Sequence, residues 1–219
     1  MSKANFITLE GGEGAGKTTL LNTLEEMLSA QGISVVRTRE PGGTLFGDEV
    51  RRWLLSHHSD VKIGSKAELL LFLASRAQHI EEVIAPALAA GKVVLCDRFN
   101  DSTVAYQGYA RGLGAAWVRS LCNNVCGDVL PGLTLYLDVD PKIGLERTRG
   151  AAKENAASGN VDRIESEKFE FHQRVRSAFL EISKQEPKRF FPIDALQPQT
   201  AVWQQAKDIL SHHLKKLSG

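Results

Sequence analysis

The chain has 219 residues, of which 42% are apolar and 24% are charged, enough for a single globular domain over residues 1–219. Its 27 Lys and Arg residues nearly balance its 26 Asp and Glu residues, which excludes a strong basic field directed at nucleic acid or an anionic membrane. No signal peptide and no apolar run of about 18 residues is visible, so we expect a cytoplasmic protein whose partners are small molecules.

The first predicted strand, over residues 6–9, leads into a glycine-rich segment. Residues 11–18 fill every position of the phosphate-binding pattern G-x-x-x-x-G-K-[ST], and leucines at helical spacing predict a helix that starts near Lys17. The loop would turn its N–H groups toward one anion, with the positive helix N-terminus behind them. Lys17 should reach the β- and γ-phosphates of a nucleoside triphosphate, and Thr18 should reach Mg²⁺. The predicted nucleotide-binding residues are Gly11, Gly12, Glu13, Gly14, Ala15, Gly16, Lys17, Thr18 and Thr19.

The second predicted strand, over residues 33–37, precedes the segment Arg39-Glu-Pro-Gly-Gly-Thr44. Arg51 and Arg52 should begin the next turn or helix. The glycines suggest a backbone that lies close to a ligand, and the arginines suggest that this ligand is an anion. Arg39 would stand at the carboxyl end of its strand, where parallel sheets bind ligands.

The next helical pattern contains Phe72 and Arg76, which stand four residues apart and therefore share one helix face. A nucleobase could stack on the ring of Phe72 and accept a hydrogen bond from the guanidinium of Arg76. The alternative is that Phe72 packs in the core, as an aromatic residue in an apolar helix usually does.

The third predicted strand, over residues 93–97, ends in an adjacent carboxylate and guanidinium. Asp97 could hold Mg²⁺ through water while Arg98 grips phosphate oxygens with two hydrogen bonds. The alternative is a surface ion pair. A parallel sheet, however, would bring these two residues to the same edge as the phosphate-binding loop, which favours the functional interpretation.

Hydroxyl and amide side chains follow this strand at residues 101–108. Ser102, Thr103 and Gln107 are hydrogen-bonding groups suited to a loop or to the start of a helix. Helix capping by Ser102 explains the same pattern equally well.

Strands are also predicted over residues 133–138 and 189–194, and an amphipathic helix over residues 201–217. The alternation of strands with helical patterns predicts an α/β fold around a parallel sheet. Residues 150–160 are small and polar and lie between helical stretches, which favours a mobile lid. We therefore take residues 149–163 as the candidate lid segment.

The three cysteines, Cys96, Cys122 and Cys126, are an odd number, which argues against a disulfide framework. Cys122 and Cys126 could share a helix face as metal ligands. No His or further Cys lies close to them in sequence, so small packed thiols are the better interpretation.

Six motifs, in chain order and over most of the chain, resemble those of the thymidylate kinase family in its bacterial form, which belongs to the P-loop nucleoside monophosphate kinases. They are Glu10-Gly-Gly-Glu-Gly-Ala-Gly-Lys-Thr18, Thr38-Arg-Glu-Pro-Gly-Gly-Thr44, Phe72 with Arg76, Asp97-Arg-Phe99, Ser102-Thr-Val-Ala-Tyr-Gln-Gly108 and Asp162-Arg-Ile-Glu165. The resemblance implies a five-stranded parallel sheet flanked by helices, usually in a homodimer. It also implies transfer of the γ-phosphoryl of ATP to dTMP, giving dTDP and ADP, with Mg²⁺ as cofactor.

The same resemblance implies roles for the acceptor-site residues. Phe72 would stack on thymine, Arg76 would donate to its O4, and Ser102 or Thr103 would lie near N3. Tyr106 would lie against the deoxyribose. A guanidinium donor suits the O4 acceptor of thymine and opposes the amino group of cytosine. The residues expected to hold the acceptor phosphate are Arg98, Arg51 and Arg39.

Catalysis should need no general base, because the phosphate of dTMP, with a second pKa of about 6, is largely dianionic at neutral pH. Lys17, Mg²⁺ and arginines would align two polyanions and stabilise the transferring phosphoryl group. The resemblance implies that Glu13 orients the sugar hydroxyl or a metal-bound water. Family members with an arginine beside this acid carry their catalytic cation in the loop. Here Gly14 occupies that position, so the cation should come from the lid, with Arg149 and Arg163 ranked above Lys153.

Two alternatives remain at the level of sequence. A deoxynucleoside kinase, such as a thymidine kinase, would need a base such as Glu40, whereas Arg39, Arg51 and Arg98 argue for an acceptor that already carries phosphate. A nucleotide-dependent switch would regulate a partner instead, but the chain has neither N-K-x-D for guanine nor a D-x-x-G switch.

Overall fold

The fold is built around one parallel sheet. In the computed structural model, residues 5–56, 61–154 and 162–215 are described. The sheet has five strands in the order β2-β3-β1-β4-β5. The strands are β1 (Phe6–Gly11), β2 (Val35–Arg39), β3 (Val93–Asp97), β4 (Leu133–Asp138) and β5 (Phe190–Asp194). All neighbouring strands pair in parallel, so every carboxyl end lies at one edge, and the predicted fold class is confirmed.

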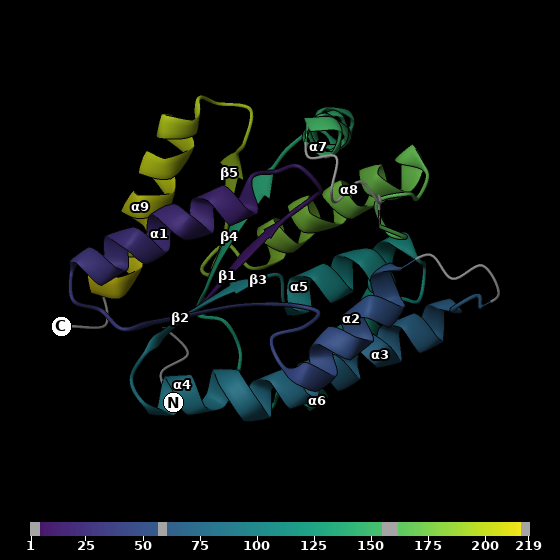
Figure 1. The fold of residues 1–219 in the computed structure, drawn as a ribbon, viewed down its shortest axis with the longest axis horizontal. Helices are drawn as coiled ribbons and strands as arrows, with labels where there is room; N and C mark the ends of the chain where they lie inside the picture. Colours follow the sequence, from purple (N-terminus) through teal and green to yellow (C-terminus); the bar gives the residue numbers. More distant parts are fainter. Residues whose placement is uncertain (1–4, 57–60, 155–161, 216–219) are drawn as a thin grey trace.

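Helices connect the strands and cover the sheet (Figure 1). The α-helices are α1 (Lys17–Ala30), α2 (Leu45–Leu55), α3 (Ser65–His79), α4 (Ala85–Ala89), α5 (Asn100–Thr103), α6 (Ala115–Cys126), α7 (Pro141–Glu154), α8 (Phe169–Gln185) and α9 (Gln199–Lys215). Two π-helical segments, η2 (Ile80–Ile84) and η3 (Val104–Ala110), continue α3 and α5 without a break. π-Helical turns are rare and occur often at functional sites.

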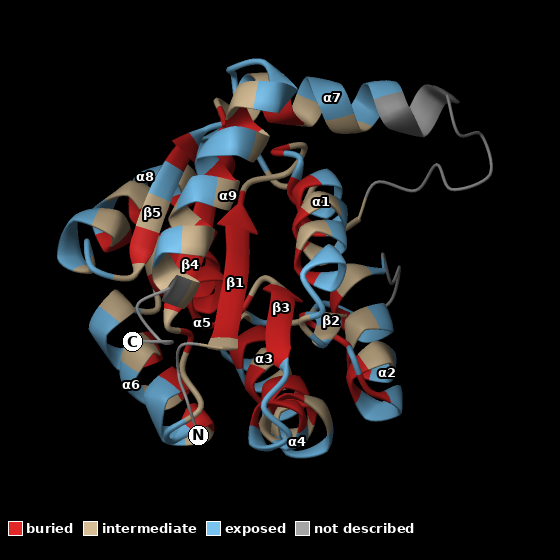
Figure 2. Ribbon diagram, turned by 90° about the vertical axis from the view of Figure 1, so that its left-hand side faces the viewer, coloured by how far each residue is buried: buried red, intermediate tan, exposed pale blue. Residues whose placement is uncertain are grey.

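The central strands are buried on both faces, as Figure 2 shows for β1 and β3. One apolar cluster joins the strands to α1 and α9, and a second joins β4 to α3, α6, η3 and α8. This arrangement explains why the strands read as nearly continuous apolar runs. The sheet is thereby packed between helices, which fixes the position of its carboxyl edge.

Several predicted boundaries were wrong. The second strand was placed two residues early, and Arg39 is its last residue rather than a residue after it. Arg51 lies well inside α2, which begins at Leu45 because the Thr44 hydroxyl accepts a hydrogen bond from the Gly47 N–H. The helix predicted over residues 201–217 begins earlier, at Gln199.

The candidate lid segment is only partly described. Residues 149–154 continue α7 as helix, so the predicted loop beginning at Gly150 was wrong at its start, while residues 155–161 lie outside the described part of the chain. Residues 162 and 163 belong to a turn that precedes α8.

Within the described ranges, no helix is both long and apolar enough to cross a membrane. The three cysteines are free and buried, which confirms the prediction of packed thiols.

Candidate active site

The phosphate-binding loop connects β1 to α1. Gly16 stands immediately before the helix with a positive φ of 92°, and Lys17 is the first helical residue, as predicted. The Lys17 ammonium donates to the carbonyls of Gly11 (3.2 Å) and Gly12 (3.0 Å). Burial and the nearby Arg98 lower the pKa of Lys17. Thr18 and Thr19 are exposed in the first turn of α1, so the helix N-terminus faces solvent, where an anion can reach it.

Helix α7 packs directly against this loop. Gly14 has a positive φ of 64°, and a Cβ atom there would lie 2.1 Å from the Gly144 carbonyl oxygen. A side chain such as arginine therefore does not fit at position 14. Instead, Arg147 on α7 reaches the loop, where its Nη1 donates to the Gly14 carbonyl (3.4 Å). Sequence reasoning missed Arg147, because nothing local connects α7 to the loop.

A pocket opens beside the loop at the carboxyl edge of the sheet. Eleven of the predicted site residues line it, and they come from the loop, the end of β3 and five helical segments. They are Glu13, Lys17, Arg51, Phe72, Arg76, Asp97, Arg98, Ser102, Thr103, Tyr106 and Gln107. The structure thus brings together groups that are spread over most of the sequence.

Arg98 connects the loop to the pocket. Its Nη2 donates to Glu13 Oε1 (2.7 Å), and its Nη1 donates to the Gly11 carbonyl (2.9 Å). Its guanidinium lies over the Tyr106 ring, 5.2 Å from the centroid. Burial opposes the charge, but Tyr106, Glu13 and Asp97 raise the pKa of Arg98. Arg98 is the non-glycine residue with positive φ (67°) among the described residues, and such strained conformations cluster at functional sites.

Glu10, which sequence reasoning did not single out as a site residue, holds the segment after β3 in place. Its fully buried carboxylate accepts from the Phe99 N–H (2.8 Å) and from the Ser102 hydroxyl (2.5 Å). Ser102 in turn accepts from Arg98 Nη1 (3.2 Å). Burial and Asp101 raise the pKa of Glu10 to about 8. Ser102 therefore orients Arg98, and it is not the helix cap that we considered, because α5 begins two residues earlier.

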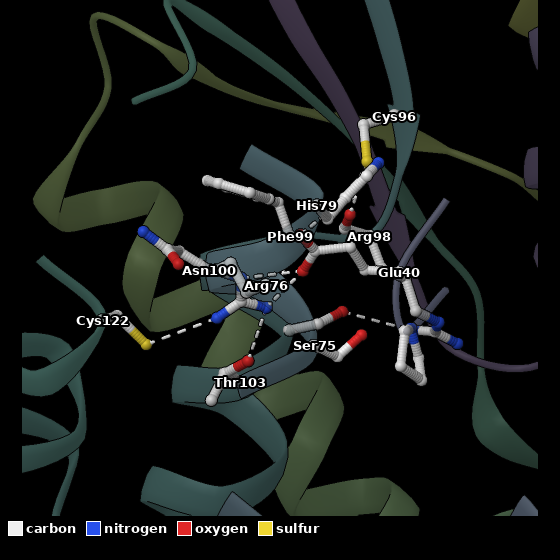
Figure 3. A network of polar contacts seen from close by, with 12 residues as sticks. Glu40, Ser75, Arg76, His79, Cys96, Arg98, Phe99, Asn100, Thr103 and Cys122 are labelled. Atoms are coloured by element: carbon white, nitrogen blue, oxygen red, sulfur yellow. Dashed lines mark hydrogen bonds and ion pairs between the residues drawn. The ribbon is translucent and has the colours of Figure 1, made fainter. Parts of the chain in front are cut away.

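Arg76 is almost fully buried and forms the centre of a second network (Figure 3). Its Nε donates to Glu40 Oε2 (2.7 Å), and its Nη2 lies 2.7 Å from the same oxygen and donates to Thr103 Oγ1 (2.9 Å). Its Nη1 donates to Cys122 Sγ (3.7 Å), which leaves one N–H of this nitrogen for a ligand. Glu40 also pairs with His79 (3.0 Å), so a carboxylate considered as a catalytic base is fully engaged in holding Arg76.

The π-helical segment η3 presents its side chains to the pocket. Tyr106 donates to Glu13 Oε1 (3.3 Å), and Gln107 donates to the buried Glu68 (2.8 Å). Phe72, on α3, is only partly buried and lines the same pocket as Arg76, so the predicted common face is confirmed. An aromatic ring, a guanidinium and hydroxyls thus surround one space, which is the chemistry that a planar base requires.

Two carboxylates complete the pocket from the turn before α8. Asp162 and Glu165 both line it, although they were predicted only as part of a family motif. Asp162 Oδ1 accepts from the Ile164 and Glu165 N–H groups (2.8 Å each). Burial, Glu13 and Asp162 raise the pKa of Glu165 to about 7.

Three predicted arginines lie outside this pocket. Arg39 is exposed and pairs with Asp48 (3.2 Å), and Arg149 is exposed on α7. Arg163 donates to the Leu54 carbonyl (2.8 Å) and to Glu68 (2.5 Å). By contrast, Arg51 lines the pocket, held by a hydrogen bond to the Pro41 carbonyl (3.0 Å).

The residues present fit a magnesium ion that is shared with a nucleotide. Among the described residues, Asp97 Oδ1 is buried without a hydrogen-bond partner, which a metal-bound water would supply. No group of three or more His, Cys, Asp or Glu side chains forms a metal cage in the described ranges. Mg²⁺ is commonly held by only one or two carboxylates together with substrate phosphates, so this sparse donor set suits it.

Comparisons with known proteins agree on one family. The family model described as thymidylate kinase matches residues 9–206. A thymidylate kinase of Protochlamydia amoebophila is 58% identical over 95% of this chain and 92% of its own, and one of Magnetococcus marinus is 50% identical over 90% of each chain. A crystal structure of thymidylate kinase from Ehrlichia chaffeensis is similar with a TM-score of 0.73 and 37% identity, over 94% of this chain and 97% of that one.

Proposed function

This chain belongs to the thymidylate kinase family and phosphorylates dTMP to dTDP, and we propose that it does so with ATP at the loop of residues 11–19 and dTMP in the adjoining pocket. The observation that carries this proposal is the group of cations at the junction of the two sites. Lys17, Arg51 and Arg98 all line the pocket, which lies at the carboxyl edge of the sheet. When donor and acceptor both carry phosphate, cations are needed at the junction to offset the repulsion between them. Thymidine carries no phosphate, so an enzyme that phosphorylates thymidine would not need these cations.

The pocket binds the nucleoside of dTMP through complementary groups. Phe72 stacks on thymine, and the second Nη1–H of Arg76 donates to its O4. Thr103 accepts from N3, since Ser102 is already engaged by Glu10 and Arg98. Tyr106 packs against the deoxyribose, and Gln107 supports this wall of the pocket through Glu68.

The chemistry requires alignment and charge neutralisation rather than a base. The dianionic acceptor phosphate is itself the nucleophile, held by Arg98 and Arg51, both of which line the pocket. Lys17 binds the transferring phosphoryl group and offsets the repulsion between two polyanions. Although burial works to raise the pKa of Glu13, Arg98 and Lys17 lower it, so this carboxylate stays ionised and orients the sugar hydroxyl.

Mg²⁺ is the cofactor that this arrangement suits, with Thr18 and Asp97 as the residues that would hold it, directly or through water. When bound, it neutralises phosphate charge. Of the two arginines considered as the remaining catalytic cation, Arg149 is the better candidate. Arg149 stands exposed on α7, the helix that packs against the loop, whereas Arg163 is engaged elsewhere.

We propose a homodimer as the oligomeric state. Helices α3 and α6 lie against each other, and each exposes a large apolar side chain, Leu70 (60% exposed) and Trp117 (47% exposed). Apolar side chains of this size are characteristic of interfaces. Sedimentation equilibrium should give twice the chain mass of 24.0 kDa, and a mass equal to one chain would contradict the dimer.

An acceptor assay tests the function directly. Release of ADP from Mg·ATP should be fastest with dTMP and slower with dUMP, because one methyl group contributes about 1–3 kcal/mol in an apolar pocket. dCMP, thymidine and the ribonucleotide form of TMP should be poor acceptors. Turnover with thymidine alone would make the protein a nucleoside kinase, and turnover without any acceptor would point to a switch.

A further inference from the structure

Glu68 is a buried carboxylate at the centre of a network outside the catalytic chemistry. Glu68 lies on α3 and is only 1% exposed. Four side-chain nitrogens donate hydrogen bonds to its carboxylate. Gln107 Nε2 (2.8 Å) and Arg111 Nε (3.1 Å) donate to Oε1, and Arg111 Nη2 (3.2 Å) and Arg163 Nη2 (2.5 Å) donate to Oε2. Hydrogen bonds from Gln107, Arg111 and Arg163 outweigh burial and lower the pKa of Glu68.

These partners join separate parts of the chain at one point. Gln107 belongs to η3, and Arg111 follows its last residue. Arg163 belongs to the stretch of residues 162–167, which we call the acidic turn. Arg111 also donates to Glu167 of this turn (2.5 Å). Two carboxylates and two guanidiniums thus alternate, and their charges cancel.

Arg163 attaches the acidic turn to α2 as well. Its backbone N–H donates to the Leu55 carbonyl (2.8 Å), and its Nε donates to the Leu54 carbonyl (2.8 Å). Its guanidinium is therefore shared between two fixed protein acceptors. These two contacts direct the guanidinium toward α2 and α3, and Arg163 is not among the residues that line the acceptor pocket.

The acidic turn reaches the acceptor pocket on either side of Arg163. Asp162, Ile164 and Glu165 all line that pocket, whereas Arg163 points away toward Glu68. Within the turn, Asp162 accepts from the N–H groups of Ile164 and Glu165, which fixes its local shape. Its position relative to the pocket depends on the Arg163 contacts and on the Arg111–Glu167 pair.

We infer that Glu68 and Arg163 are positioning residues, which together hold the acidic turn in place as one wall of the acceptor pocket. Arg163 acts in this way and is not the catalytic cation. The inference rests on the proposed function, in which this pocket receives dTMP. It means that an ion pair whose two residues do not themselves line the acceptor pocket determines how tightly that pocket binds the acceptor.

The test compares Glu68→Gln, Arg163→Ala and the double variant with wild type in steady-state kinetics. Each single variant should raise the KM for dTMP about tenfold, change kcat by less than about threefold, and leave the KM for ATP unchanged. The effect of the double variant should be smaller than the two single effects combined, since both single variants remove the Arg163–Glu68 contact. Arg119→Ala is the matched control, because it removes the ion pair (2.6 Å) between Arg119 on α6 and Glu186, the residue after α8, and should leave all constants unchanged.

A structural readout separates this inference from the proposed function. Amide exchange at Ile164 and Glu165 should accelerate in both single variants without any substrate, and Arg163→Lys should restore part of the protection because it keeps one donor for Glu68. A large loss of kcat in Arg163→Ala with normal kinetics in Glu68→Gln would overturn the inference and make Arg163 the catalytic cation. Unchanged exchange and unchanged dTMP affinity would also overturn it. Failure of wild type to use dTMP would instead refute the proposed function.

Discussion

Replacing Lys17 with alanine should lower kcat by about 10²–10³-fold with dTMP and ATP, the loss seen when one preorganised donor to developing charge is removed. Lys17 is the first residue of α1, and its ammonium already lies among the carbonyls of the loop. Removing it leaves the transferring phosphoryl group without the cation that we assign to it. Steady-state ADP release, with both substrates varied, gives kcat and both KM values.

Lys92→Ala is the matched control for this variant, since Lys92 is exposed just before β3, at the opposite edge of the sheet. It should retain wild-type kcat and unchanged stability. The assigned role of Lys17 would be refuted if Lys17→Ala raised only the KM for ATP while kcat stayed normal, because the lysine would then bind ground state and transition state equally.

Replacing Arg76 with alanine should reduce both stability and acceptor affinity. The variant leaves Glu40 buried with only His79 beside it, and breaking a buried ion pair in this way costs about 3–5 kcal/mol. It also removes the remaining N–H that we assign to thymine O4, so the dissociation constant for dTMP should rise at least about tenfold. Urea unfolding measures the first effect, and calorimetric titration with dTMP measures the second.

Two further variants make this prediction specific. Arg119→Ala breaks a half-exposed Arg–Glu pair and should cost only about 0–1 kcal/mol. Arg76→Lys keeps a charge beside Glu40 but cannot bond Glu40, Thr103 and Cys122 together, so it should recover more stability than dTMP affinity. If Arg76→Ala unfolded at the same urea concentration as Arg119→Ala, the ion pair would not hold this site together.

Several parts of the fold and site followed from local sequence. The phosphate loop is a run of consecutive residues. Wherever this pattern lies between a strand and a helix, its glycines form the turn and its lysine begins the helix, so the loop can be predicted locally. The central strands β1, β3 and β4 were recognisable because they are buried on both faces and therefore mostly apolar. The common face of Phe72 and Arg76 followed from helical spacing, and both residues line one pocket.

Other parts were inaccessible because their partners are distant in the chain. Glu10 belongs to the first motif, but its role could not be predicted, since this carboxylate in a strand acquires it only when Ser102, 92 residues later, is folded beside it. Arg163 matched a motif that suggested catalysis, yet its position is set by Glu68, 95 residues earlier. The start of α2 depends on the cap at Thr44. We instead placed the start of this helix at Arg51 and Arg52, because a single capping residue is a weak signal in the sequence.

The sequence by itself therefore determined the class of ligand, the parallel sheet and the edge at which chemistry occurs, because loop geometry and strand patterning are local properties of the chain. Only the tertiary structure decided which charges face the ligand and which hold the protein together. An arginine pairs with whichever carboxylate folding brings within hydrogen-bond reach, and burial decides whether that pair is free to exchange its partner for a substrate. Arg98 and Arg163 look equivalent in sequence, but one lines the pocket and the other fastens its wall.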